Sequence, residues 1–127
     1  PCRAGGLHLI PLVSPAPSLE RAAMIMGEAT GFVYSVNVCG ITGIREQLPP
    51  EVAGRLAALK ERSPVPVAAG FGIADSASAK AIARVADGVV VGSAVISKLL
   101  VPGDLVERRR AAAALVGSLA GSLSRHA

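Results

Sequence analysis

The sequence has few aromatic residues, and this shortage narrows the range of functions. Among its 127 residues are two Phe, one Tyr and no Trp. Proteins that hold single-stranded nucleic acid usually stack its bases on aromatic rings. No predicted loop carries a run of Lys and Arg either, so we expect no nucleic-acid partner. The net charge of +4 is mild and suits an anionic small molecule.

Cysteine and long apolar runs are also scarce. Cys2 and Cys39 form neither a CxxC pair nor a metal-type spacing, so we expect free thiols in a reducing compartment and no metal. There is no signal-peptide pattern and no apolar stretch of membrane-spanning length, so we expect no membrane partner. The predicted location is the cytoplasm, with the plastid stroma as the alternative. Because the sequence begins at Pro1, we expect a processed or truncated N-terminus.

Aliphatic residues dominate the composition of the chain, and their pattern predicts repeated strand–helix units. Apolar runs bounded by glycine and proline predict strands near residues 7–13, 32–38, 65–69 and 88–91. Helical patterns follow each run, and the last one covers residues 104–123. Such repeats indicate an α/β protein with a parallel sheet and right-handed crossovers, in a single domain over residues 1–127. A doubly wound sheet and half of an eight-stranded barrel both fit this pattern.

Glycine-rich turns follow the last two predicted strands and form the strongest candidate site. Gly70-Phe71-Gly72 ends one strand, and Gly92-Ser93 ends the next and opens a helix. A phosphate needs several N–H groups that converge without obstruction, and the N-terminus of a helix adds a positive dipole end. In closed barrels the loops after strands seven and eight, with a short helix, build such a site. The sequence therefore predicts a phosphate site; the alternative is that these glycines only make tight turns.

Two further features lie near the second predicted strand. The loop after it contains Gly40-Ile41-Thr42-Gly43, in which the Thr42 hydroxyl and the Gly43 N–H are candidate ligand contacts. An ordinary flexible turn is the alternative. Tyr34 shares a strand face with Phe32. Periodicity alone leaves open whether this face meets a ligand or packs against helices.

Groups for acid–base chemistry are not evident in the sequence. There is no Ser/His/Asp arrangement and no pair of buried carboxylates. We expect His8 to be packed or hydrogen-bonded, and Glu46, Asp75 and Asp87 to lie in loops or helix caps. The residues thus predict a place to hold an anion without a general acid or base.

Five segments, in this order, resemble the C-terminal half of the tryptophan synthase alpha chain. They are residues 9–15 (LIPLVSP), 31–36 (GFVYSV), 40–43 (GITG), 66–73 (PVAAGFGI) and 87–94 (DGVVVGSA). The resemblance implies a (β/α)8 TIM barrel, of which this chain would supply strands five to eight with their helices. It also implies a lyase of tryptophan biosynthesis that cleaves indole-3-glycerol phosphate to indole and glyceraldehyde 3-phosphate.

The resemblance further implies a role for particular residues. The substrate phosphate would be held by Gly43, Gly72, Gly92 and Ser93. The indole pocket would be bordered by Tyr34, Phe71 and Val90. Thr42 would lie on a closing loop and help to orient a catalytic aspartate. Asn37 and Cys39 depart from the usual pattern of this loop. No cofactor is expected in this chain, because pyridoxal phosphate would belong to a partner beta chain.

The catalytic glutamate and aspartate of that family come from its N-terminal half, which this sequence does not contain. We therefore expect little or no lyase activity from this chain alone. It would be a fragment, a half that needs a complementing N-terminal half-barrel, or a degenerate copy. A non-catalytic half-barrel binding module and a fragment of another phosphate-binding TIM-barrel enzyme are the alternative readings.

Overall fold

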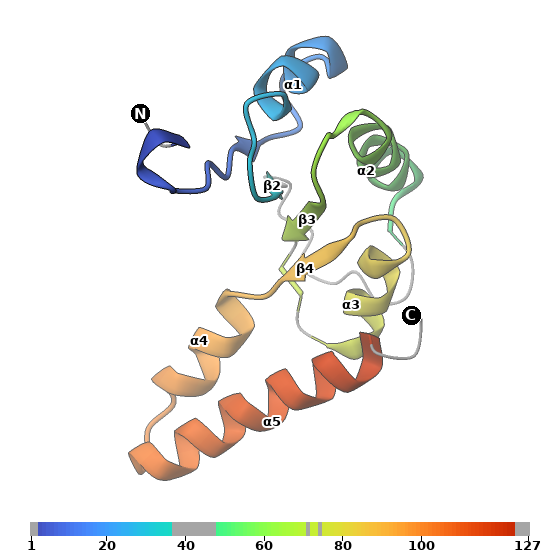
Figure 1. The fold of residues 1–127 in the computed structure, drawn as a ribbon. Helices are drawn as coiled ribbons and strands as arrows, with labels where there is room; N and C mark the ends of the chain where they lie inside the picture. The colour runs from blue at the N-terminus through green and yellow to red at the C-terminus, as the bar shows by residue number, and fades with distance from the viewer. Residues whose placement is uncertain (1–2, 37–47, 71, 74, 124–127) are drawn as a thin grey trace.

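The computed structural model describes residues 3–36, 48–70, 72–73 and 75–123. Four parallel strands form one sheet in the order β1-β2-β3-β4. Their bounds are β1 Leu12–Val13, β2 Val33–Val36, β3 Val67–Gly70 and β4 Gly88–Val90. The parallel sheet with intervening helices that the sequence predicts is therefore confirmed, and each strand pairs with its sequence neighbour (Figure 1).

The first strand is much shorter than predicted. The sequence indicated residues 7–13, but the ladder with β2 contains only Leu12 and Val13. Pro11 lacks an N–H group, so it accepts from the Tyr34 N–H at 3.0 Å but donates nothing in return. The prediction of residues 65–69 for the third strand was likewise shifted, since β3 begins at Val67, after Pro66.

In the described ranges, five α-helices follow a short 3-10 helix, η1 (Arg3–Gly5). The Ser18 hydroxyl accepts from the Arg21 N–H and caps the first helix, and a proline opens the second. The helices are α1 Leu19–Met26, α2 Pro50–Arg62, α3 Ser76–Ala83, α4 Ser93–Leu100 and α5 Leu105–Leu123. The last agrees closely with the predicted helix over residues 104–123.

The core lies on one face of the sheet. Side chains of β2 and β3 alternate between buried and partly exposed, so every second residue points to the helices. Val33 and Val67 pack with residues of α1 and α2, such as Met26 and Leu59. Ala69 belongs to a second cluster, built with α2, α3 and α5. The alternate residues, which include Tyr34 and Gly70, are partly exposed on the opposite face.

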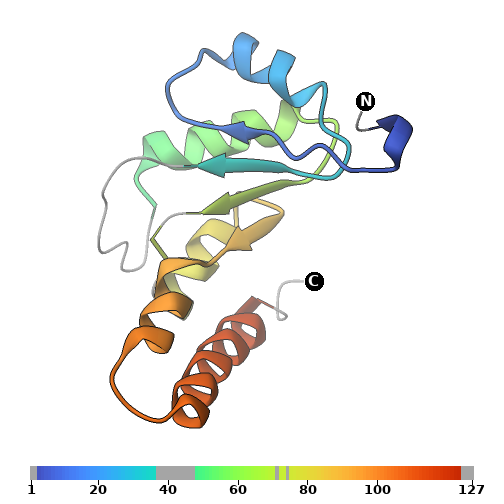
Figure 2. The same cartoon turned by 90° about the vertical axis from the view of Figure 1, so that its left-hand side faces the viewer.

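Two charged side chains, Asp87 and Arg108, fix the ends of strands and helices. Asp87, just before β4, accepts from the Val67 N–H at 2.9 Å and pairs with Lys60 of α2 at 2.8 Å. It thus joins β3, β4 and α2 at the amino ends of the strands. Arg108 of α5 donates to the Leu99 carbonyl at 3.0 Å and so holds α5 to the end of α4. Figure 2 shows α4 leaving the arrowhead end of β4 and α5 turning back beside it.

Candidate functional site

The carboxyl ends of β3 and β4 lie side by side because the two strands are parallel neighbours. Gly72 follows β3 with φ +38°, a left-handed conformation that glycine adopts without strain. Ser93 follows β4 and is the first residue of α4. The two predicted phosphate-binding residues line the same cavity of about 360 Å³. The complete set of lining residues is Gly72, Ile73, Ser93, Ala94, Ser97, Lys98 and Leu115.

The N-terminus of α4 offers free backbone donors to this cavity. The Val95 and Ile96 N–H groups both bond to the Gly92 carbonyl at 3.0 Å. The N–H groups of Ser93 and Ala94 precede them, where a helix has no carbonyl of its own to accept them. Within the described part of the chain, no side chain caps this end. Backbone donors and the positive end of the helix dipole therefore meet at one point, an arrangement that favours an anion.

Gly92 is not required by its backbone angles or by nearby protein atoms. Its φ is −114°, which any residue can adopt, and a Cβ built on it would meet no described atom within 4 Å. The space that a side chain at this position would occupy is therefore free of described atoms. A ligand that approaches the backbone closely would explain glycine at this position, because any side chain would block that approach.

Tyr34 and Val90 lie on the partly exposed face of the sheet, together with Gly70. The register pairs Val36 with Gly70 and Gly70 with Val90, while Tyr34 lies two residues before Val36 on the same face. The Tyr34 ring covers Gly70, since a Cβ on Gly70 would lie 2.5 Å from the Tyr34 hydroxyl oxygen. The structure thus resolves the question of orientation: Tyr34 faces away from the helix-packed core.

Three of the predicted site residues, Thr42, Gly43 and Phe71, fall outside the described residues. Sequence reasoning did not single out Ile73, Ala94, Ser97, Lys98 or Leu115 as cavity residues. A signal for part of this set was available. Residues 93, 94, 97 and 98 follow the spacing that puts side chains on one face of a helix.

Carboxylates do not line the cavity within the described part of the chain. Asp75 caps α3 through the Ser78 N–H at 2.8 Å, and this hydrogen bond lowers its pKa. The hydrogen bond from Lys60, aided by the Val67 N–H, lowers the pKa of Asp87. His8 is hydrogen-bonded through Nδ1 to the Thr30 carbonyl at 2.7 Å, as expected. These groups have structural roles, so the cavity can hold an anion but has no general acid or base among the described residues.

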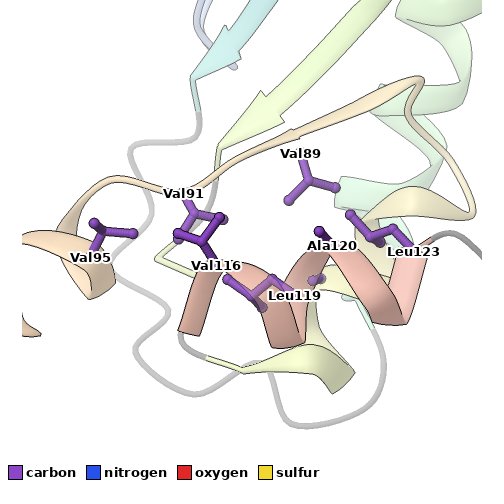
Figure 3. A pocket seen from close by; sticks show the side chains of 8 residues that line it. Val89, Val91, Val95, Val116, Leu119, Ala120 and Leu123 are labelled. Atoms are coloured by element: carbon purple, nitrogen blue, oxygen red, sulfur yellow. The ribbon is translucent and has the colours of Figure 1, made fainter. Parts of the chain in front are cut away.

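A second cavity, of about 280 Å³, is almost entirely apolar (Figure 3). It lies between β4, α3 and α5 on the core side of the sheet, and its lining is Ala79, Val89, Val91, Val95, Val116, Leu119, Ala120 and Leu123. Val89 and Val91 point into it, whereas Val90 between them faces the other way, as the strand alternation requires. With no charged lining residue, this cavity is a packing feature and not an anion site.

Two other features are absent from the described residues. No group of three or more His, Cys, Asp or Glu side chains is placed to hold a metal ion there. Over the same ranges, no helix combines the length and apolar character needed to cross a membrane.

Comparison with known proteins gives a consistent result. The family model of the tryptophan synthase alpha chain matches residues 1–122. The tryptophan synthase alpha chain of Xanthomonas euvesicatoria pv. vesicatoria is 44% identical over 119 residues, and that of Burkholderia pseudomallei is 41% identical over 118. Both alignments cover 93% of this chain but only 44% and 42% of those relatives. The chain therefore spans less than half the length of these curated relatives.

Solved structures agree with the sequence comparison. A chain from the tryptophan synthase a2b2 complex of the hyperthermophile Pyrococcus furiosus superimposes with a TM-score of 0.80 at 32% identity. The alignment covers 94% of this chain and 48% of that one. The separate alpha subunit from the same organism gives a TM-score of 0.79 at 30% identity, with 94% and 47% covered.

Proposed function

Because the chain belongs to the family of the tryptophan synthase alpha chain, we propose that its cavity at the start of α4 holds the phosphate of indole-3-glycerol phosphate. One observation carries the proposal: Gly72 and Ser93 come from different strand ends yet line one cavity, at a helix terminus with free N–H groups. The Ser93 hydroxyl and the backbone at Gly72, Gly92 and Ser93 would donate to the phosphate oxygens. Gly43 would add a further N–H group.

The indole ring would lie on the partly exposed face of the sheet, beyond the phosphate. Tyr34 and Val90 supply apolar surface there, and the absence of a side chain on Gly70 lets the Tyr34 ring lie against β3. Phe71 would complete this pocket. A flat aromatic substrate suits a site with one large ring and small neighbours, since ring–ring contacts add to the area that is buried.

The complete reaction would be carbon–carbon bond cleavage that releases indole and glyceraldehyde 3-phosphate. Proton transfer in such a cleavage needs a general acid and a general base. The cavity has neither among the described residues, so the two carboxylates would come from a complementing N-terminal half-barrel. Thr42 would help to orient one of them. We therefore propose that this chain alone binds the phosphorylated ligand but has little or no lyase activity.

A beta chain is the proposed protein partner, since the similar Pyrococcus furiosus chain belongs to an a2b2 complex. Pyridoxal phosphate would then be bound by that partner and not by this chain. The proposed location is the cytoplasm.

Binding of glycerol 3-phosphate to the 127-residue chain, measured by calorimetry or NMR titration, tests the phosphate site. Gly92→Asp places a negative charge next to Ser93, at a position where an added Cβ would meet no described atom within 4 Å, so it should abolish binding. Gly72→Asp should do the same. Gly54→Asp is the matched control, because Gly54 lies on the exposed surface of α2 and its added Cβ would also meet nothing. Unchanged affinity in Gly92→Asp would remove the assignment.

Indole release from indole-3-glycerol phosphate tests the catalytic part of the proposal. The chain alone should give no release above background, and addition of an N-terminal half-barrel from a relative should restore it. Full turnover by the isolated chain would show that the required acid and base lie within these 127 residues. Binding without turnover, even after complementation, would favour the non-catalytic binding module.

A further inference from the structure

Lys98 lines the same cavity as Gly72 and Ser93, although nothing in the sequence motifs points to it. It lies one helical turn beyond Ala94, so the two residues share a face of α4. Side chains of a helix lean towards its N-terminus. The stem of Lys98 therefore leans towards the end of α4 at which the N–H groups of Ser93 and Ala94 lie, and Lys98 lines the cavity there.

Among its described lining residues, the cavity has a positive side chain and no negative one. These residues include no Asp or Glu, and Lys98 is the single ionised residue among them. Within the described ranges, Lys98 has no ion-pair or hydrogen-bond partner, and the one ion pair formed there is Lys60–Asp87. Asp104, which lies between α4 and α5, accepts from the Val106 N–H at 3.2 Å and so caps α5. The charge of Lys98 is thus left for a ligand.

Of the polar side chains that line the cavity, Ser93 and Lys98 have hydrogen-bond donors that are not already used within the described residues. Ser97 already donates its hydroxyl hydrogen to the Ala94 carbonyl at 2.8 Å. Ser93 makes no side-chain hydrogen bond among the described residues, and the ammonium of Lys98 carries three donors. The Ser93 hydroxyl and the Lys98 ammonium are therefore the side-chain donors that an anion in the cavity could use.

We propose that Lys98 is a further phosphate-binding residue, which selects dianionic phosphate esters in a cavity otherwise built from backbone donors. This inference rests on the proposed phosphate site. Lysine binds phosphate as a compact point charge and not through the planar fork of arginine, so its contribution is mainly electrostatic. Because the side chain is exposed, that contribution falls as salt rises. A cation in the last turn of a helix also favours the helix dipole, but that effect acts on stability and not on ligand affinity.

Titration of glycerol 3-phosphate against the 127-residue chain tests the role of Lys98. At low ionic strength, Lys98→Gln should weaken binding about fivefold to tenfold, and Lys98→Glu should weaken it further. Lys98→Arg should stay within about twofold of the wild type, since it keeps the charge. The dependence of affinity on salt should become shallower in Lys98→Gln. Lys80→Gln on α3 is the control, and circular dichroism verifies that each variant is folded.

The possible outcomes separate this inference from the proposed function. If Gly92→Asp abolishes binding while Lys98→Gln and Lys98→Glu bind like the wild type, the phosphate site stands and the role of Lys98 is refuted. If the wild type binds no glycerol 3-phosphate, both are refuted. If Lys80→Gln weakens binding as much as Lys98→Gln, the effect is a general one of net charge, and the assignment to Lys98 is wrong.

Discussion

Replacement of Gly70 by alanine should displace the Tyr34 ring. A Cβ at this position would lie 2.5 Å from the Tyr34 hydroxyl oxygen, 2.9 Å from Cε2 and 3.1 Å from Cζ. Ordinary contacts between non-bonded carbon atoms are about 3.5–4.0 Å. The backbone of β3 is held between β2 and β4, so the side chain must give way instead. Tyr34 is partly exposed and has solvent into which its ring can swing.

The energetic cost of Gly70→Ala combines two opposing effects. Overpacking typically costs about 1–3 kcal/mol. Loss of glycine from a strand returns about 0.5–1 kcal/mol of backbone entropy. The free energy of unfolding should therefore fall by about 1 kcal/mol. In a Tyr34→Ala background the clash is absent, so the same Gly70→Ala change should be neutral or slightly stabilising.

Two assays test the predicted clash between Tyr34 and an alanine at position 70. Urea unfolding followed by circular dichroism gives the stability of the two single variants and the double variant. Tyr34 is the sole tyrosine and there is no tryptophan, so intrinsic fluorescence reports on this one ring. Acrylamide should quench it more strongly in Gly70→Ala. An additive double-mutant cycle with unchanged quenching would refute the contact between Tyr34 and Gly70.

Two further changes test contacts outside the site. Asp87→Asn should lower the free energy of unfolding by about 1 kcal/mol at neutral pH, because it removes the ion pair with Lys60 and weakens the bond from the Val67 N–H. These contacts lower the pKa of the Asp87 carboxyl in the folded state. Its contribution to the free energy of unfolding is therefore present above about pH 4, the unfolded pKa, and disappears as pH falls through the lower folded pKa. A stability difference between wild type and variant that grows with acid would contradict this. Asp75→Ala should cost about 1 kcal/mol by removing the cap of α3, whereas Asp75→Asn should retain most of it, as thermal unfolding can show.

The parallel order of the strands could be predicted because each apolar run is bounded by glycine or proline and followed by a helical pattern. The first and last residues of each strand were harder to predict from the sequence. Residues 7–10 are as apolar as a strand, but Pro11 cannot donate to the ladder and pairing begins at Leu12. Strand pairing depends on backbone donors, which hydrophobic patterns do not report.

The two strand ends that form the anion cavity were also predictable, since glycine at a strand end and Ser93 at a helix start are local signals. The direction of Tyr34 was not, because alternation gives two faces without saying which one the helices cover. That choice is made by the packing of Met26 and Leu59 against Val33 and Val67. Lys98 could not be predicted for a similar reason. It belongs to no sequence motif, and its proposed role depends on the fold, which brings it into the same cavity as Gly72 and Ser93.

The alternation of side chains along β2 and β3 assigns two different roles to neighbouring residues: one maintains the fold and the next faces the proposed ligand pocket. Val33, Val67 and Ala69 are fully buried beneath helices, and changes there act on the fold. Tyr34 and Gly70, each adjacent to one of these, face the other way, towards the proposed indole pocket. Substrate preference in such a scaffold can therefore drift, or be redesigned, at every second strand position while the adjacent positions keep the chain folded.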